Sequence, residues 1–300
     1  MSLLIAENVV KDYAEHRALN DVSIEVPNSS IFGLLGPNGA GKTSLIRIIN
    51  QITGPDQGTI YLDGEPLKPN HIEHIGYLPE ERGLYKKMKV GEQALYLARL
   101  KGLSTHEAKK RLQEWFKRME IIDWWDKKVE DLSKGMAQKV QFVTTVLHEP
   151  KLLIFDEPFS GFDPINANLI KDEILRLREN GATVIFSTHR MESVEELCDH
   201  IALINKSEKI LDGKLSDIKN DYKNGIYELQ YHSGNFPVEM PNGMTITEQS
   251  EGRARIQLAE GIAANQLLQF ILPHVGITSF KEEIPSANDI FIQTVQKASV

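Results

Sequence analysis

The sequence predicts an α/β fold whose core is a doubly wound parallel sheet. Three short and almost wholly apolar runs have the composition of buried parallel strands: IFGLL at 31–35, KLLIF at 151–155 and TVIFS at 183–187. Helical patterns lie between these runs, and strands that alternate with helices form parallel sheets. At 300 residues and 41% hydrophobic composition, the chain can bury a full core.

Three strand-like segments alternate apolar and polar residues in the N-terminal part of the chain: LLIAENVV, ALNDVSIEV and GTIYLDGEPL. The third contains Asp-Gly at 63–64, a sequence typical of a tight hairpin turn. We therefore expect an antiparallel β subdomain in addition to the parallel sheet.

Helices are predicted from their start signals. One begins at Gly41, a second follows Ser104, which has the capping-box spacing with Glu107, and a third begins after Asp163. The region of about 87–148 carries helical patterns without strand signals. We expect this region to be a helical insertion.

The pattern changes after about residue 216. Short strand-like segments and an apolar helix follow, and the last helix has Ser286 and Asp289 at its start. The sequence therefore predicts two domains, a large one over 1–215 and a small C-terminal α/β domain over 216–300.

Charge and cysteine content narrow the function classes. The formal charge is −8, and both domains hold more acidic than basic residues, which argues against a nucleic-acid partner. No apolar run approaches the roughly 20 residues that span a bilayer. Cys198 is the single cysteine, and no charged-then-apolar leader opens the chain. We expect a cytoplasmic protein.

The stretch LLGPNGAGKTSL at 34–45 has the spacing of a phosphate-binding loop: Gly36, four residues, then Gly41, Lys42 and Thr43. Glycines let backbone N–H groups surround a phosphate, and the following helix N-terminus adds partial positive charge. Lys42 would reach the β- and γ-phosphates, and the Thr43 hydroxyl would bind Mg²⁺. The sequence predicts binding of a nucleoside triphosphate, against the alternative of a turn with an incidental lysine.

Candidate catalytic residues follow the other two buried strands. Asp156 and Glu157 end the run LLIFDEP, at the edge where open α/β sheets bind ligands. Asp156 suits Mg²⁺, and Glu157 suits a general base that polarises the attacking water. His189 follows the third run and could reach the γ-phosphate. Two alternatives stay open: the acids cap a helix, and the histidine is structural.

Together these motifs resemble the nucleotide-binding domain of ATP-binding cassette (ABC) transporters over about 1–215. GPNGAGKT resembles the Walker A motif, LLIFDEP the Walker B motif, SGFD at 160–163 the D-loop, and His189 the switch histidine. Tyr13 stands where the family stacks an aromatic ring on adenine, although a strand-surface tyrosine is the alternative. The resemblance implies a P-loop NTPase with a RecA-like parallel-sheet core, an antiparallel β subdomain and a helical insertion.

The run LSKGMAQKV at 132–140 resembles the family signature Leu-Ser-Gly-Gly-Gln, with Lys134 and Met136 as departures. Ser133 would cap the next helix, so that its hydroxyl, the N–H of Gly135 and the helix dipole face an anion. A plain helix cap would have the same sequence. Because the family pairs head to tail, the resemblance implies that Ser133 and Gly135 face the ATP of a second chain.

A further departure is Glu80, within GYLPEERGLY at 76–85, where the family usually has glutamine in a loop that contacts Mg²⁺ or its water. The runs YLPEERGLY and LSKGM and the ending IPSANDIFI at 284–292 resemble bacterial sodium-exporter and ABC-2-type export subunits with a small C-terminal domain. On this evidence the resemblance extends over the whole chain.

The resemblance implies an ATPase subunit that dimerises with a second nucleotide-binding domain, identical or related. It would lie on the inner face of the cell membrane through an integral-membrane permease and would energise export. Expected catalytic residues are Lys42, Glu157 and His189, and expected Mg²⁺ ligands are Thr43, Glu80 and Asp156. The expected ATP-binding residues are Tyr13, Gly36, Asn38, Gly39, Ala40, Gly41, Lys42, Thr43, Ser44, Ser133 and Gly135.

Two other functions stay open. A soluble ABC-type ATPase would act without a permease, but such proteins usually carry two cassettes, a long coiled-coil insertion or basic arms. A nucleotide-dependent regulator is favoured by the departures at Glu80, Lys134 and Met136, and disfavoured by the presence of Glu157 and His189.

Overall fold

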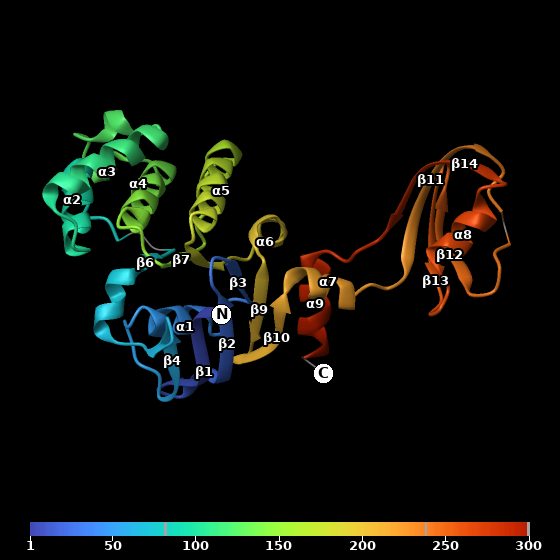
Figure 1. Cartoon of the computed structure of the whole chain (residues 1–300), viewed down its shortest axis with the longest axis horizontal. Coiled ribbons are helices and arrows are strands. Elements are labelled where there is room, and N and C mark those ends of the chain that lie inside the picture. The colour runs from blue at the N-terminus through green and yellow to red at the C-terminus, as the bar shows by residue number, and fades with distance from the viewer. Residues whose placement is uncertain (81–82, 238, 299–300) are drawn as a thin grey trace. The chain divides into compact units, whose positions relative to one another are not determined.

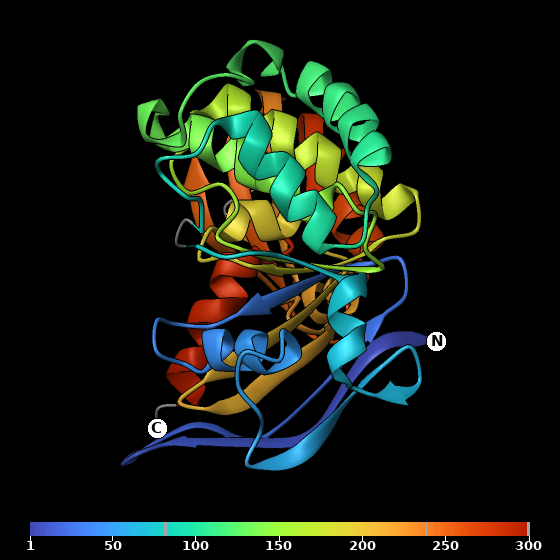
Figure 2. The same cartoon turned by 90° about the vertical axis from the view of Figure 1, so that its left-hand side faces the viewer.

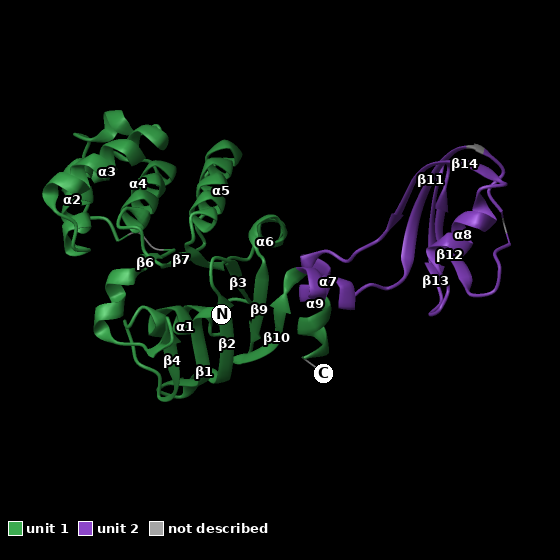
Figure 3. Ribbon diagram, in the orientation of Figure 1, with its two compact units in different colours: residues 1–215, 293–300 green, residues 216–292 purple. Residues whose placement is uncertain are grey.

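The computed structural model describes residues 1–80, 83–237 and 239–298, which form two compact units (Figure 3). The first unit comprises Met1–Leu215 with Gln293–Val300, and the second comprises Ser216–Ile292. Each unit has a hydrophobic core of its own.

An antiparallel sheet opens the first unit, as the alternating segments predict. Its strand order is β2-β1-β4-β5, with β1 (Ser2–Tyr13), β2 (His16–Pro27), β4 (Gln57–Leu62) and β5 (Glu65–Pro66). The β4–β5 turn holds Asp63 at φ 55° and Gly64 at φ 80°. Two successive positive φ values are those of a two-residue hairpin turn, so the predicted turn is confirmed.

The core of the first unit is a six-stranded sheet in the order β10-β9-β3-β8-β7-β6. All pairs are parallel except the antiparallel edge pair of β9 and β10. The three apolar runs form its centre, and every residue of the three central strands is buried. The strands are β3 (Ile31–Leu35), β6 (Ile75–Leu78), β7 (Leu152–Asp156), β8 (Thr183–Ser187), β9 (His200–Asn205) and β10 (Glu208–Lys214). The sequence pattern did not predict β6, β9 or β10.

The predicted helical insertion is confirmed: α2, α3 and α4 pack on one another between β6 and β7. Figures 1 and 2 show these helices and the antiparallel sheet at opposite ends of the first unit. The helices of the unit are α1 (Lys42–Ile49), α2 (Val90–Leu100), α3 (Thr105–Arg118), α4 (Lys134–Val146), α5 (Pro164–Glu179) and α6 (Met191–Leu197), with short 3₁₀ turns at Pro69–His74, Ile122–Trp124 and Val129–Asp131.

Helix starts follow the predicted caps with one exception. The Asp163 carboxylate accepts hydrogen bonds from the N–H groups of Ile165 and Asn166, both at 3.0 Å, and caps α5. The Ser104 hydroxyl accepts from the N–H of Glu107 at 3.2 Å. The second hydrogen bond of the predicted capping box, from the Ser104 N–H to the Glu107 side chain, is wrong. The Glu107 carboxylate instead pairs with Arg111, 2.7 Å away and one turn along the helix.

The second unit contains a four-stranded antiparallel sheet that packs on helix α8. Leu229, Ile256 and Leu267 are fully buried between the sheet and α8. The strand order is β12-β13-β11-β14. The elements of this C-terminal part are α7 (Leu215–Asp221), β11 (Ile226–Gly234), β12 (Met244–Ser250), β13 (Arg253–Leu258), α8 (Ala264–Ile271), β14 (Val275–Glu282) and α9 (Ala287–Lys297).

The only cysteine of the chain, Cys198, is buried directly after α6. Burial raises the pKa of its thiol above the ordinary value. Its Sγ atom lies 3.0 Å from where a Cβ at Gly33 would stand, so the thiol packs against the backbone of β3. Within the described ranges, no helix combines the length and apolar content that a bilayer span requires.

We predict that Ile154→Ala lowers the free energy of unfolding of the first unit by about 2–5 kcal/mol, because Ile154 is fully buried in the central strand. Denaturant unfolding monitored by tryptophan fluorescence measures this, since Trp115, Trp124 and Trp125 all belong to that unit. Ile165→Ala is the control, because Ile165 is 83% exposed and should change stability by less than about 0.5 kcal/mol. Equal losses in both variants would contradict the assigned core.

Candidate functional site

The glycine-rich loop connects the end of β3 to the start of α1, and close backbone contacts require glycine at two of its positions. A Cβ at Gly36, where φ is 148°, would lie 2.1 Å from the carbonyl oxygen of Ile204. A Cβ at Gly41, where φ is 116°, would lie 2.3 Å from the carbonyl oxygen of Ala18. The loop is therefore pressed between β9 and β2, while around Gly39 the space is open.

Helix α1 begins at Lys42 without a side-chain cap. Most helix starts use a side-chain oxygen to satisfy their first N–H groups, and an uncapped start leaves these groups for a ligand. Partial positive charge and free donors at one helix end suit an anion such as phosphate.

The Lys42 side chain folds back over the loop. Its Nζ donates to the carbonyl oxygens of Gly36 at 2.7 Å and Pro37 at 3.0 Å. Burial lowers the pKa of Lys42, while the carboxylates of Asp156, Glu157 and Glu80 act in the opposite direction. The Lys42 ammonium is thus a half-buried cation near the carboxylates of Asp156, Glu157 and Glu80. These acids lie far from Lys42 in the sequence.

A pocket of about 240 Å³ lies over this loop. It brings together most of the predicted site residues: Tyr13, Asn38, Gly39, Ala40, Gly41, Lys42, Thr43, Ser44, Glu80, Asp156 and Glu157. His16, Ala18 and Ser187 complete the lining and were not predicted. Gly36 does not line the pocket, but it lets the loop lie against the Ile204 carbonyl of β9. His189, Ser133 and Gly135 do not line the pocket either.

Buried oxygen groups gather where β7 and β8 end. Asp156 is 6% exposed, and burial raises its pKa, as do the nearby carboxylates of Glu80 and Glu157. The buried Ser187 hydroxyl faces this carboxylate and, as a hydrogen-bond donor, acts on its pKa in the opposite direction. A desolvated carboxylate beside other carboxylates is costly unless a cation offsets the charge.

These oxygens fit a small hard cation. Thr43, Asp156 and Glu80 offer a hydroxyl and two carboxylates, and Mg²⁺ typically takes one or two carboxylates, with substrate phosphates and waters as the other ligands. Over the described ranges, no cluster of three or more acids, histidines or cysteines is arranged to hold a metal unaided. The residues therefore suit a cation that arrives with a phosphate. Glu81 and Arg82, which belong to the same predicted loop, lie outside the described residues.

The Glu157 carboxylate is held at the end of β8. Its Oε1 accepts from the Nδ1 of His189 at 2.7 Å and from the His189 backbone N–H at 2.8 Å, and its Oε2 accepts from the Thr188 hydroxyl at 3.2 Å. The alternative that the two acids cap the following helix is wrong, because Asp163 caps α5. Glu157 has a positive φ of 49°, an uncommon conformation for a residue other than glycine.

His189 reaches the site through Glu157 rather than by lining the pocket. Its side chain is 73% exposed, and its Nδ1 donates to the Glu157 carboxylate. A neutral imidazole that donates from Nδ1 can only accept at Nε2. His189 could therefore donate to a phosphate oxygen only with a proton on each nitrogen.

Tyr13 lies at the end of β1 and is 40% exposed at the pocket. The Nζ of Lys11 lies 5.4 Å from its ring centroid. An exposed aromatic face beside a phosphate-sized pocket suits a stacked base.

The segment that resembles the signature forms the start of α4. Ser133 accepts from the N–H of Met136 at 3.2 Å, so the predicted helix cap is confirmed. Neither Ser133 nor Gly135 lines the pocket over the glycine-rich loop. Within one chain, this helix end and that pocket are separate features.

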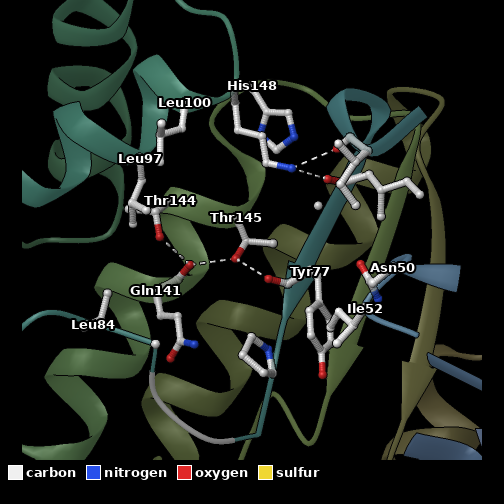
Figure 4. Close-up of a pocket in the computed structure, with 16 residues that line it drawn as sticks. Asn50, Ile52, Tyr77, Leu84, Leu97, Leu100, Gln141, Thr144, Thr145 and His148 are labelled. Atoms are coloured by element: carbon white, nitrogen blue, oxygen red, sulfur yellow. Dashed lines mark hydrogen bonds between the residues drawn. The ribbon is translucent and has the colours of Figure 1, made fainter. Parts of the chain in front are cut away.

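A second pocket, of about 360 Å³, lies between the helical insertion and the parallel sheet (Figure 4). Figure 4 shows Leu97 and Leu100 of α2 on one wall, with Ile52 and Tyr77 on the other. Leu100 and Ile52 are 63% and 55% exposed. The pocket therefore presents apolar side chains to solvent.

Two polar groups stand in this apolar surface. Gln141 is 5% exposed, and its Oε1 is buried without a hydrogen-bond partner among the described residues. Lys101 donates to the carbonyl oxygens of Ile72 and Ile75, both at 2.9 Å. Burial, followed by the Lys101 charge, lowers the pKa of His148 to about 4, so His148 is neutral near pH 7.

Comparison with known proteins gives consistent matches over both units. A family model described as ABC transporter matches residues 19–160, and one described as ATP-binding protein DrrA1-3-like, C-terminal domain, matches residues 213–295. The uncharacterized ABC transporter ATP-binding protein YhaQ of Bacillus subtilis is 40% identical over 295 residues, 98% of each chain. The Nod factor export ATP-binding protein I of Cupriavidus metallidurans is 35% identical over 216 residues, 71% of each chain.

The solved structures include one described as the ATP binding subunit of an ABC transporter, which matches with a TM-score of 0.70 at 29% identity. The match covers 74% of this chain and 93% of that chain.

We predict that Gly36→Ala abolishes ATP binding, because the added Cβ would collide with the Ile204 carbonyl and displace the loop. Gly39→Ala is the matched control: its Cβ meets nothing within 4 Å, so only the backbone strain of about 1–2 kcal/mol at positive φ remains. Titration calorimetry measures both affinities, and circular dichroism checks that both variants fold. Wild-type affinity in Gly36→Ala would contradict the role assigned to this contact.

Proposed function

Because the chain belongs to the ABC transporter family as an ATP-binding subunit, we propose that it works as one half of a pair of nucleotide-binding domains whose closure over ATP drives export through a separate permease. As a member of this family it is an ATP-hydrolysing protein with a P-loop NTPase fold.

The observation that carries the proposal is the separation of two anion-facing helix ends. The start of α1 lies in the pocket over the glycine-rich loop, whereas the start of α4, with Ser133 and Gly135, does not line that pocket. A head-to-tail pair would place the α4 end of one chain against the nucleotide of the other, and each ATP would then contact both chains. Ile165, 83% exposed and two residues after the D-loop-like residues 160–163, is an apolar side chain suited to such an interface.

In the proposed nucleotide site, Tyr13 stacks on adenine and the loop residues Asn38–Ser44 surround the phosphates with N–H groups. Lys42 would exchange its loop carbonyls for the β- and γ-phosphate oxygens. Gly36 contributes by letting the loop approach β9.

Thr43, Asp156 and Glu80 would hold Mg²⁺, either directly or through water. The cation would supply positive charge against the phosphates and offset the mutual repulsion of the carboxylates in this pocket. Their hydroxyl and carboxylate oxygens, gathered at one pocket, support the assignment.

Glu157 is the proposed general base. Its carboxylate lies at the pocket and is oriented by His189 and Thr188, so it can accept a proton from a water that attacks the γ-phosphate. His189 would hold Glu157 in place and, when protonated on both nitrogens, would donate to the γ-phosphate.

The proposed membrane partner is a permease segment that enters the apolar pocket beside α2, placing the chain at the inner face of the cell membrane. The exposed apolar walls and the unpartnered Gln141 Oε1 support a protein occupant that supplies a hydrogen-bond donor. Pro79, Gly83 and Leu84 line this pocket, while Glu80 lines the nucleotide pocket. One loop thus takes part in both pockets.

We predict that Glu157→Gln retains ATP binding but slows hydrolysis by about 10²- to 10⁴-fold, because a positioned base contributes that much. The amide keeps the size of the side chain and cannot take the proton. Phosphate release measures turnover, and analytical ultracentrifugation with ATP should detect an accumulating dimer. Normal hydrolysis in this variant would remove Glu157 from the mechanism.

The dimer is tested with the wild-type chain. The rate of ATP hydrolysis per molecule should rise with protein concentration and then level off once nearly all chains are dimeric. Ser133→Ala chains mixed with Glu157→Gln chains report whether one copy acts on the nucleotide of the other. A rate per molecule independent of concentration would overturn the paired site.

We predict that Ile52→Glu with Leu100→Glu releases the chain from the membrane fraction, because charge in the apolar pocket is costly to bury against a partner. ATP binding by the isolated chain should be unchanged, and co-purification of an integral-membrane protein measures the contact. Leu272→Glu is the control, since Leu272 is also exposed but lies in the second unit. Equal release by the control would contradict the assigned docking surface.

A further inference from the structure

We propose that Lys134 is a positioning residue that clamps the loop 158–163 to the start of α4. The loop and the helix end that carries Ser133 and Gly135 would then act as one surface toward the second chain. This inference rests on the proposed function, because the clamped surface is the one that would meet the partner nucleotide.

The first observation is the path of the Lys134 side chain. Its Nζ donates to the Ser160 hydroxyl at 3.1 Å. Its stem lies against Gly161, where an added Cβ would stand 2.5 Å from Cδ and 2.6 Å from Cε of the lysine. Gly161 has a φ of 85°, a conformation that favours glycine, and the lysine stem fills the space beside it.

The second observation is a parallel tether one helical turn further along. Gln138 is 2% exposed, and its Nε2 donates to the carbonyl oxygen of Pro158 at 3.4 Å. Residues four apart lie on the same face of a helix, so Lys134 and Gln138 hold two points of the loop along one side of α4. Between them, a Cβ at Gly135 would lie 3.4 Å from the Gly161 carbonyl oxygen.

The clamped loop is anchored at both ends to proposed functional groups. It follows Glu157, whose carbonyl accepts from the N–H of Ser160 at 3.0 Å, and it ends at Asp163, which caps α5. A shift of Ser160 therefore acts within three residues on the backbone that presents the Glu157 carboxylate. The hydrogen bond from Lys134 joins this backbone to the helix end with Ser133.

Helix stability does not explain a lysine at this position. Lys134 is the first residue of α4, where the helix dipole disfavours positive charge. Its hydrogen-bond partner is the neutral hydroxyl of Ser160, which offsets that cost only in part. The Lys134 side chain thus orders the loop, although its charge lowers the stability of the first turn of α4.

The test uses a double-mutant cycle in the full chain. Lys134→Met keeps most of the stem and removes the ammonium, and Ser160→Ala removes the acceptor. We expect each to lower kcat by about 3- to 10-fold, the effect of one lost hydrogen bond, with the KM for ATP changed by less than about 2-fold. The double variant should lose no more than either single variant. Lys134→Arg should restore most of the rate, and Lys109→Met, on the exposed face of α3, should change nothing.

Independent losses that multiply in the double variant would overturn the clamp. A raised KM for ATP in Lys134→Met with normal Ser160→Ala would also overturn it, since the lysine would then act on the nucleotide directly. Hydrogen exchange in nucleotide-free protein separates this failure from that of the proposed function. Amides of 159–163 should exchange faster in Lys134→Met than in wild type whether or not chains pair, and unchanged exchange would refute the clamp.

Discussion

The nucleotide pocket depends on the register of three parallel strands. Leu34 and Asp156 both pair with Ser187, so the segments after β3, β7 and β8 leave the sheet at the same level. Parallel pairing places all carboxyl ends at one edge, and the helices that return the chain occupy the faces. A phosphate-binding loop then meets two consecutive acids and a histidine that follow it by more than a hundred residues in the sequence. A shift of one residue in β7 would turn Asp156 to the other face of the sheet.

The parts of the fold that could be predicted are those specified by short windows of sequence. Runs such as IFGLL have no polar residue to place on a solvent face, so they predict buried strands. β6 is only four residues long and includes Gly76, and β9 begins three residues after α6, so neither stands out from its neighbours. The capping box at Ser104 failed because Glu107 had a second partner, Arg111, in reach on the same helix face.

The same limit applies to the site. Contiguous spacing predicted the glycine-rich loop and the acids after β7. It could not predict Ala18, whose carbonyl oxygen enters the site because β2 approaches the start of α1, nor the place of Ser187 in the pocket lining. Ser187 ends a predicted buried strand two residues before His189, which is the signal that could have found it. The contact between Lys134 and Gly161 joins two motifs that sequence reasoning treats separately.

The buried cysteine gives this chain an experimental property of its own. Cys198 packs against the backbone of β3, and burial keeps its thiol protonated, so it is a poor nucleophile toward alkylating reagents. The natural chain is therefore already suited to site-directed thiol labelling. A cysteine placed on the exposed part of the start of α4, and another on the glycine-rich loop, could be joined across two copies with little background from the native side chain.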